Sequence, residues 1–212
     1  MAKTAPFDAH PDRYDAWFDR HDAAYRSERR AIRTLLPDHG EGMEIGVGTG
    51  RFAAPLGLEH GVDPSRAMRK RARERGIEVR EGTAENLPYP DARFDAVLMT
   101  TTLCYLDSPA TAFSEAKRVL RPDGTFVVAF VDRNRPLGQH YAEKRDDNVF
   151  YKPARFHAAP DVVVLFQDTG FGSLRAQQTL FSDPDTMTEP DPVREGYGTG
   201  SFVVIRGKNV HG

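Results

Sequence analysis

Apolar and polar positions alternate along this chain with two periods, one typical of strands and one typical of helices. Short apolar or alternating runs predict seven strands, at about residues 42–46, 58–62, 77–81, 94–100, 125–131, 174–181 and 201–206. Apolar side chains three or four residues apart predict helices at about 63–75, 108–120 and 161–168, with a short helix after residue 50. Strands that alternate with helices indicate a single-domain α/β fold with a doubly wound, mostly parallel sheet.

The N-terminal part of the chain lies outside this alternation. Residues 12–36 have helical spacing, and the turn-forming residues 37–40 end the helical pattern. Four aromatic residues lie along this segment: Tyr14, Trp17, Phe18 and Tyr25. We expect residues 1–40 to form an N-terminal helical lid on a main domain of residues 41–212.

A glycine-rich turn follows the first predicted strand of the main domain. The run is Glu44-Ile45-Gly46-Val47-Gly48-Thr49-Gly50, and the next strand ends in Gly61-Val62-Asp63. Glycine lets the backbone approach a ligand closely, and an acid after the second strand can accept both hydroxyls of a ribose. The pattern therefore indicates a nucleoside site at the carboxyl edge of a parallel sheet.

The details of this turn distinguish between nucleosides. The third glycine comes one residue too early for the dinucleotide fingerprint, and no Gly-Lys-Ser or Gly-Lys-Thr of a P-loop occurs. Glu44 would repel a pyrophosphate but attract an α-ammonium. A ligand with both a ribose and an amine fits best, and S-adenosylmethionine is such a ligand.

Four sequence blocks carry a family resemblance. They are E-I-G-V-G-T-G, G-V-D-P-S-x-x-M, G-T-A-E-N-L-P-Y-P-D-x-x-F-D and R-V-L-R-P-D-G, within about residues 42–131. In this order the blocks resemble class I S-adenosylmethionine-dependent methyltransferases, and most closely the small single-domain type 11 group. The resemblance implies a Rossmann-like seven-stranded sheet whose last strand is antiparallel, with residues 41–212 as the methyltransferase domain. It also implies that S-adenosylmethionine is bound and S-adenosylhomocysteine is released.

The cofactor-binding residues follow from the motifs and the resemblance together. We expect the three glycines at the methionine part of the cofactor, Glu44 near its ammonium and Asp63 on the ribose, although Asp63 also fits a helix N-cap. Met68 can cover the adenine or simply pack in the core. The full expected set is Tyr14, Glu44, Gly46, Gly48, Gly50, Asp63, Pro64, Met68, Thr83, Ala84, Glu85, Thr100 and Leu103.

Two features depart from the family pattern. Thr83 stands where relatives usually carry an acid for the adenine amino group, so we expect the Ala84 backbone to carry that contact, with Thr83 or Glu85 assisting. Only twelve residues separate Gly50 from Asp63, so the first helix should be about one turn shorter.

No catalytic residue can be assigned from the sequence. A sulfonium is already an activated methyl donor, so a base is needed only for an acceptor that arrives protonated. His140, Tyr25 and Cys104 are weak candidates, and His157 is another by location. Cys104 fits a small buried hydrophobe better than a reactive thiol. An exposed loop position is the simpler interpretation of His140 and His157.

Aromatic residues suggest the acceptor class. Tyr14, Trp17, Phe18, Tyr25, Tyr105, Tyr141, Tyr151 and Tyr197 all fall on segments directed at the ligand edge. They could form a lid and a pocket for a small acceptor that is partly apolar or cationic. Alternatively, the N-terminal aromatics only fix a helix to the sheet.

Composition limits the remaining function classes. A net charge of −2 argues against general nucleic-acid binding, and the six basic residues within 66–75 surround a helix whose buried stripe is Ala67, Met68 and Ala72. A single cysteine excludes an internal disulfide and a multi-cysteine zinc site, so we expect no metal. No apolar run approaches a membrane span and the N-terminus lacks a signal-peptide core, so we expect a cytoplasmic protein.

These observations predict an enzyme that methylates a small molecule by direct in-line displacement. Two other interpretations remain open: a non-catalytic S-adenosylmethionine-binding protein, and an RNA or protein methyltransferase. The acceptor, the methylated atom and the oligomeric state are left open at this stage.

Overall fold

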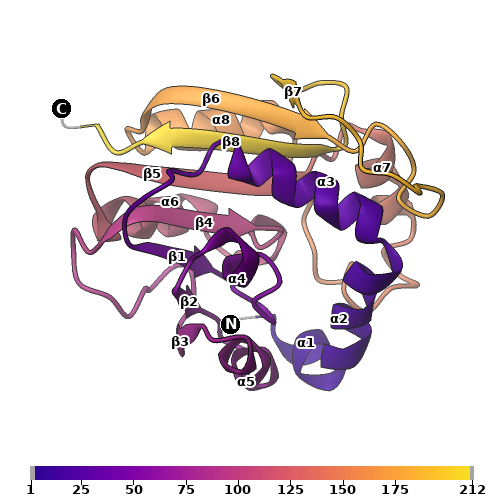
Figure 1. Cartoon of the computed structure of the whole chain (residues 1–212), viewed down its shortest axis with the longest axis horizontal. Coiled ribbons are helices and arrows are strands. Elements are labelled where there is room, and N and C mark those ends of the chain that lie inside the picture. Colours follow the sequence, from indigo (N-terminus) through magenta and orange to yellow (C-terminus); the bar gives the residue numbers. More distant parts are fainter. Residues whose placement is uncertain (1–2, 211–212) are drawn as a thin grey trace.

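A computed structural model describes residues 3–210 of the chain (Figure 1). Within that range the strands form one eight-stranded sheet in the order β3-β2-β1-β4-β5-β8-β6-β7. The strands are β1 (Gly42–Ile45), β2 (His60–Val62), β3 (Glu78–Arg80), β4 (Phe94–Thr100), β5 (Leu120–Val131), β6 (Gly172–Thr179), β7 (Arg194–Glu195) and β8 (Phe202–Lys208). The predicted single-domain α/β fold is confirmed.

The direction of the strands divides the sheet into two parts. Strands β3, β2, β1, β4 and β5 pair in parallel. The last strand, β8, is antiparallel to both β5 and β6, as expected. The eighth strand, which the sequence did not predict, is the two-residue β7 on the outer edge of β6. It lies in the 182–200 connection.

Helices cover both faces of the sheet (Figure 1). Their bounds are α1 (Ala5–Ala9), α2 (Pro11–Arg20), α3 (Asp22–Arg33), α4 (Ala53–Leu56), α5 (Arg66–Glu74), η1 (Leu103–Tyr105), α6 (Pro109–Val119), α7 (Pro136–Glu143) and α8 (Ala159–Asp168). Helix α4 has only four residues, which confirms the shortened first helix. No helix in residues 3–210 is long and apolar enough to cross a membrane.

Alternation along the central strands separates two hydrophobic cores. In β5, Phe126 and Val128 belong to the core that also contains Phe113 of α6 and Phe166 of α8. The intervening residue Val127 belongs to the other core, which the side chains of α3, α4 and α5 complete. Successive side chains of a strand point to opposite faces, so a strand buried on both sides has a continuous apolar sequence.

The N-terminal segment is three helices rather than one continuous preamble. Helices α1 and α2 meet at His10, and α2 and α3 meet at His21. Pro11 occupies the first turn of α2, where its missing N–H costs nothing. The His21 ring stacks on Trp17 at 4.6 Å, and its Nδ1 lies 2.8 Å from the Trp17 carbonyl oxygen, at the end of α2. These two breaks bend the segment around the carboxyl edge of the sheet (Figure 1).

Candidate cofactor and acceptor sites

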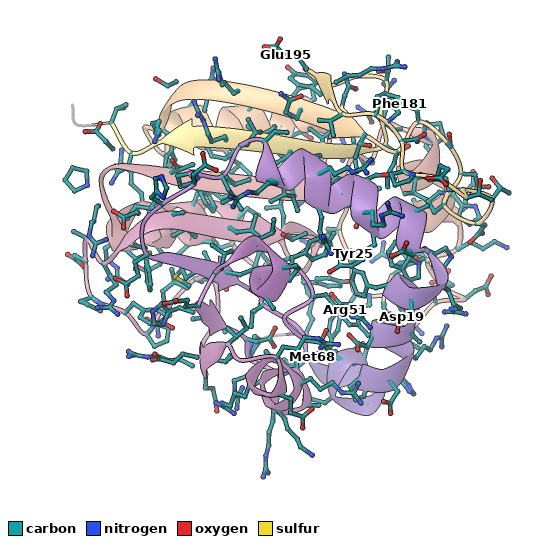
Figure 2. All side chains as sticks on the ribbon, in the orientation of Figure 1. Asp19, Tyr25, Arg51, Met68, Phe181 and Glu195 are labelled. Carbon is teal, nitrogen blue, oxygen red and sulfur yellow. The ribbon has the colours of Figure 1, made fainter. Side chains whose placement is uncertain are left out.

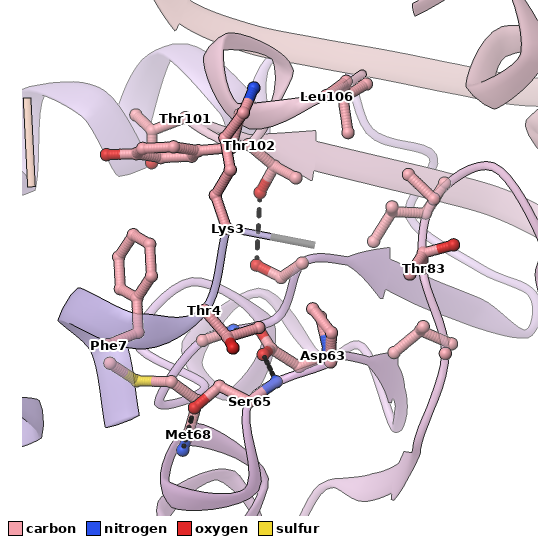
Figure 3. Close-up of a pocket in the computed structure, with 18 of the residues that line it drawn as sticks. Lys3, Thr4, Phe7, Asp63, Ser65, Met68, Thr83, Thr101, Thr102 and Leu106 are labelled. Carbon is pink, nitrogen blue, oxygen red and sulfur yellow. Dashed lines mark hydrogen bonds between the residues drawn. The ribbon is translucent and has the colours of Figure 1, made fainter. Parts of the chain in front are cut away.

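A cavity of about 430 Å³ opens at the carboxyl ends of β1, β2 and β4; we call it the strand-end cavity (Figure 3). Its floor comes from these strand ends, and its cover comes from Lys3, Thr4, Phe7 and Tyr14 of the N-terminal segment. Ten of the thirteen predicted cofactor residues line it: Tyr14, Gly46, Gly48, Asp63, Pro64, Met68, Thr83, Ala84, Glu85 and Thr100. Glu44, Gly50 and Leu103 are not among the lining residues.

The glycine turn brings backbone directly against the cavity. Gly46 has a φ of +67°, and a Cβ built there would lie 2.2 Å from Oγ1 of Thr102. Gly48 has a φ of +54° and lies under Tyr14, whose hydroxyl would be 3.4 Å from an added Cβ. Both positions therefore require glycine, one because of a close approach and both because of a left-handed backbone.

Asp63 is held at the end of β2 by the backbone. Its Oδ2 accepts a hydrogen bond from the Gly48 N–H at 2.9 Å, and its Oδ1 accepts one from the Ser65 N–H at 2.8 Å (Figure 3). An ionised carboxylate offers about four lone pairs, so two remain for ligand hydroxyls. Burial raises the pKa of Asp63 to about 6, against the opposing effect of these two N–H groups.

Unsatisfied polar atoms lie beside the glycine turn. Oε2 of Glu44 and Oγ1 of Thr100 are buried without a hydrogen-bond partner among the described residues. Glu44 pairs in register with Leu98 and so faces the core beneath α4. Burial raises its pKa well above the usual range. Burial, followed by the charges of Glu44 and Asp63, also raises the pKa of Tyr14. Tyr14 therefore lies close to both carboxyl groups.

The far end of the strand-end cavity can enclose a flat ring. Met68 is 1% exposed and lines the cavity from α5, across from Thr83 (Figure 3), and Ala84 also lines the cavity. Ser65 caps α5 by accepting a hydrogen bond from the Met68 N–H at 3.2 Å. Glu85 lines the cavity, and its Oε1 accepts from the Asp107 N–H at 3.0 Å, so part of its capacity already supports the start of α6.

Ion pairs fasten the N-terminal helices to the glycine turn. Asp15 of α2 accepts hydrogen bonds from Arg51 Nε at 2.9 Å, Thr49 Oγ1 at 2.7 Å and Arg75 Nη2 at 2.6 Å. Burial alone would raise the pKa of Asp15, but these donors outweigh it and lower the pKa to about 2. Arg51 also pairs with Asp19 (Figure 2).

Helix α1 has its own attachment to the main domain. Asp8 accepts a hydrogen bond from the Ser65 hydroxyl at 2.6 Å. Phe7 packs edge-on against Tyr14 and Tyr105, with ring centroids 5.7 and 5.1 Å away. The expected helical segment of residues 1–40 includes this helix, but its helical pattern was recognised only from residue 12, and the role of Phe7 was not predicted.

A second, smaller cavity of about 190 Å³ adjoins the first; we call it the aromatic cavity. Tyr14, Thr101 and Tyr105 line both cavities. The walls of the aromatic cavity come from α2, the start of η1, the end of β5, α7 and residues 148–157. Six aromatic residues of the predicted set line it: Tyr14, Trp17, Phe18, Tyr105, Tyr141 and Tyr151. Tyr197 is instead exposed, and Tyr25 lines neither cavity.

The three weak catalytic candidates differ in position. Cys104 lines the aromatic cavity, but burial raises the pKa of its thiol to about 12, so the thiol is protonated at neutral pH. Tyr25 donates a hydrogen bond to the Arg51 carbonyl and packs on Phe18, so it helps attach the N-terminal helices to the main domain (Figure 2). His140 is exposed on α7 and lines neither cavity. Leu103 lines the aromatic cavity, and Gly50 packs on Ala72.

One acidic side chain in the aromatic cavity was not predicted. Glu28 lines it from α3 and is 4% exposed. The sequence carries a signal for it, because Tyr25, Glu28 and Ile32 follow the spacing of a buried helical stripe. Among residues 3–210, no group of three or more His, Cys, Asp or Glu side chains is placed to hold a metal ion.

Known proteins share both the sequence blocks and the fold. The model of a methyltransferase domain, type 11, matches residues 43–128. Protein MJ1123 of Methanocaldococcus jannaschii is 41% identical over 204 residues, which cover 96% of this chain and 98% of that protein. A crystal structure from Thermotoga maritima has a TM-score of 0.93 and 47% identity, and covers 96% of this chain and 98% of that chain. It is described as a SAM-dependent methyltransferase, possible histamine N-methyltransferase.

A more distant structure shows the fold alone. Geranyl diphosphate C-methyltransferase from Streptomyces coelicolor, crystallised with S-adenosyl-L-homocysteine, has a TM-score of 0.63 at 16% identity. The match covers 87% of this chain and 79% of that chain.

A glycine turn, an acid after the second strand and an antiparallel last strand define a Rossmann-like methyltransferase. The chain belongs to the class I S-adenosylmethionine-dependent methyltransferases, type 11 group. It is an enzyme of that family, and S-adenosylmethionine is its cofactor. The residues around the strand-end cavity fit this cofactor, since the Asp63 carboxylate keeps lone pairs for ribose hydroxyls and the glycine turn brings backbone against the cavity.

Proposed function

We propose that the protein transfers a methyl group from S-adenosylmethionine to a small-molecule acceptor by direct in-line displacement. The observation that carries this proposal is the pair of adjoining cavities, which share Tyr14, Thr101 and Tyr105. The strand-end cavity would hold the cofactor and the aromatic cavity the acceptor. The three shared residues then mark the place where the two molecules meet.

Each cofactor contact follows from the geometry around the strand-end cavity. Asp63 would accept the ribose hydroxyls with the lone pairs that Gly48 and Ser65 leave free. Met68, Thr83 and Ala84 would enclose the adenine, with Glu85 and Pro64 at its rim. Gly46 and Gly48 would let the methionine part pass close to the backbone, and Glu44 and Thr100 would attract its ammonium.

The cofactor supplies a methyl group already activated on a sulfonium, so the chain has to position the acceptor and exclude water. Residues 1–40 would serve as the lid, since Phe7 and Tyr14 cover the strand-end cavity. The aromatic faces near the sulfonium would stabilise its positive charge.

The size of the aromatic cavity favours a small acceptor. Its volume of about 190 Å³ is below the roughly 300–1,000 Å³ that is usual for drug-sized ligands. The basic helix α5 gives little support for an RNA substrate. Four of its arginines donate hydrogen bonds within the protein. Arg69 donates to Asp63 and Glu81, and Arg71 donates to Asp12. Arg73 donates to Val79, and Arg75 donates to Asp15.

The test is a labelling experiment on a metabolite extract. We would incubate the protein with methyl-labelled cofactor and the extract, histamine being added as one defined amine, and identify labelled products by mass. We expect a labelled product of low mass that disappears with the Asp63→Ala variant. Label found only in RNA or protein would contradict the proposal, as would cofactor binding without turnover on any fraction.

A further inference from the structure

The aromatic cavity contains a buried acid that the rest of the protein does not use. Glu28 is 4% exposed, lines the cavity and makes no hydrogen bond or ion pair with any described residue. In contrast, the hydroxyl group of the neighbouring Ser27 has both a hydrogen-bond acceptor and a donor. The Ser27 hydroxyl donates to the Ala23 carbonyl at 2.8 Å and accepts from the Asp191 N–H at 2.9 Å. Helix α3 is therefore well ordered at this point, and only the acid lacks a partner.

An acid in this position lowers the stability of the fold. A buried carboxyl group loses its hydration and gains nothing in return unless it finds a donor or a cation. Leucine or glutamine would occupy the same part of α3 with a smaller penalty. The unpaired acid is therefore better explained by a bound molecule than by folding.

The described part of the chain places no cation against this acid. Arg13 and Arg20 line the same cavity but are exposed, and the Arg13 guanidinium lies 5.8 Å from the Phe150 ring centroid. Neither makes an ion pair with Glu28 within residues 3–210. Burial lowers the pKa of His157, which also lines the cavity, so its ring is neutral near pH 7. A positive charge next to Glu28 would therefore have to come from a bound ligand.

The walls around this acid suit a flat or apolar cation. Tyr141 and Tyr151 stack with ring centroids 4.3 Å apart, and Trp17 and Phe156 line the same cavity. Aromatic faces attract organic ammonium groups and pack on apolar bodies. The volume of about 190 Å³ suits a body of a few heavy atoms.

We propose that the aromatic cavity binds a small amine as a cation, with the ammonium held by Glu28 and the apolar or aromatic body packed on Trp17, Tyr141 and Tyr151. This inference rests on the proposed function, because the cavity is taken as the acceptor site. It adds a specificity-determining residue and a chemical class of acceptor: a primary or secondary amine on a short body. For methylation the bound ammonium first gives a proton to the Glu28 carboxylate, and the freed lone pair then forms the N–CH3 bond as the S–CH3 bond of the cofactor breaks.

Titration of the acid provides an additional signature of this contact. Burial raises the pKa of Glu28 to about 8, so the free protein holds it mostly protonated at pH 7. A bound ammonium favours the ionised form, and binding at pH 7 should then release a proton. The other titratable or charged groups that line the cavity are Arg13, Tyr14, Arg20, Cys104, Tyr105, Tyr141, Tyr151 and His157.

The experiment compares amines with uncharged molecules of the same shape. The full chain, saturated with S-adenosylhomocysteine, is titrated in a calorimeter with 2-phenylethylamine, histamine and pentylamine. The first and third are matched by 2-phenylethanol and pentanol. Wild type is compared with Glu28→Gln and with Glu143→Gln, which removes an exposed acid of α7. Affinity for S-adenosylhomocysteine, measured in each variant, shows that the fold is intact.

We expect at least one amine to bind wild type about tenfold or more tightly than its alcohol. Glu28→Gln should abolish this preference, and Glu143→Gln should keep it. The inference is wrong if every amine binds no better than its alcohol, or if Glu28→Gln retains the preference. Labelled methyl transfer to some other small molecule would in that case leave the proposed function standing. Failure of all turnover on a metabolite extract would instead remove the proposed function itself.

Discussion

The two cavities meet at Tyr14, Thr101 and Tyr105 but are built in different ways. In the strand-end cavity, Asp63 and Thr100 stand at strand ends, and two backbone N–H groups already orient the Asp63 carboxylate. The aromatic cavity is built from side chains of α2, α3, α7 and residues 148–157, and its acid, Glu28, has no hydrogen-bond or ion-pair partner among residues 3–210.

This difference indicates which part of the site is general and which is particular. Positions fixed by strand ends depend on the fold, so they can hold the same cofactor in many proteins. A pocket made of side chains on helices and connections can change without disturbing the sheet. We therefore expect substitutions in the two cavities to have separable effects on cofactor and acceptor.

The largest expected effect is on the strand-end cavity. Asp63→Ala removes a carboxylate that accepts two backbone N–H groups and, in our proposal, two ribose hydroxyls. We expect the affinity for S-adenosylhomocysteine to fall by about 100- to 1,000-fold, or roughly 3–4 kcal/mol, as for the loss of charge-assisted hydrogen bonds. Calorimetry measures it. An affinity within about threefold of wild type would show that the cofactor does not use Asp63.

Next in size is a gain of stability in the aromatic cavity. The pKa of Glu28 is about 8 in the fold against 4.5 in a model peptide, so the folded protein binds this proton more tightly. Its contribution to stability is thus present at low pH and is lost as pH rises from about 4.5 to 8. Glu28→Gln should remove that loss. The two pKa values bound the loss at about 5 kcal/mol, and because the ionised side chain can relax towards water, we expect the variant to be more stable than wild type at pH 9 by about 3 kcal/mol.

Urea unfolding at pH 5 and at pH 9 measures this gain. The two proteins should differ little at pH 5 and most at pH 9. If Glu28→Gln is instead less stable than wild type at pH 9, the acid has a structural partner and the contrast between the two cavities is lost.

A pair of glycines tests how tightly the strand-end cavity is built. Gly46 and Gly57 both have positive φ, but a Cβ meets Thr102 Oγ1 at 2.2 Å only at Gly46, and at Gly57 it meets nothing within 4 Å. Gly57→Ala should cost about 1 kcal/mol of unfolding free energy from backbone strain. Gly46→Ala should cost about 2 kcal/mol more and also weaken cofactor binding. If Gly46→Ala and Gly57→Ala change the unfolding free energy and the cofactor affinity equally, the backbone at Gly46 can shift to accommodate a Cβ, and the glycine turn is not tightly packed.

The smallest expected effect concerns the N-terminal helices, which contribute residues to both cavities and which we propose as the lid. Asp15→Asn keeps the shape of the side chain but removes the charge that Arg51 and Arg75 bind. We expect cofactor affinity to fall by about three- to tenfold, near 1 kcal/mol, because these pairs are only partly buried. The control is Asp22→Asn. Asp22 forms an exposed ion pair with Arg26, so its substitution should change cofactor affinity by less than about twofold. If Asp15→Asn also changes cofactor affinity by less than about twofold, the ion pairs of Asp15 do not contribute to cofactor binding.

The sequence predicted the strand-end cavity better than the aromatic one, for a physical reason. Glycines at a turn and an acid after the next strand are local signals, and the parallel sheet places both at one edge. The shortened α4 could also be predicted from the spacing of Gly50 and Asp63. Glu44 does not itself line the strand-end cavity, because its side chain alternates with those of Met43 and Ile45 and lies under α4. Its expected contact with the ammonium therefore stays a prediction.

The aromatic cavity depends on contacts between distant segments. The six aromatics were recognised as a group, but their meeting with Glu28 requires the bends at His10 and His21, which one helical period did not reveal. The contribution of α1 was missed for the same reason, since Phe7 acquires its role only through packing on Tyr14 and Tyr105. Cys104 and Tyr25 could be named as candidates, yet only their surroundings distinguish a buried thiol from a lid attachment.

A crystal structure of the full chain with S-adenosylhomocysteine tests the central claim most directly. We predict the ribose hydroxyls on Asp63 and the sulfur between Tyr14, Thr101 and Tyr105, facing the aromatic cavity. A sulfur turned away from that cavity, or a nucleoside bound outside the strand-end cavity, would contradict the account.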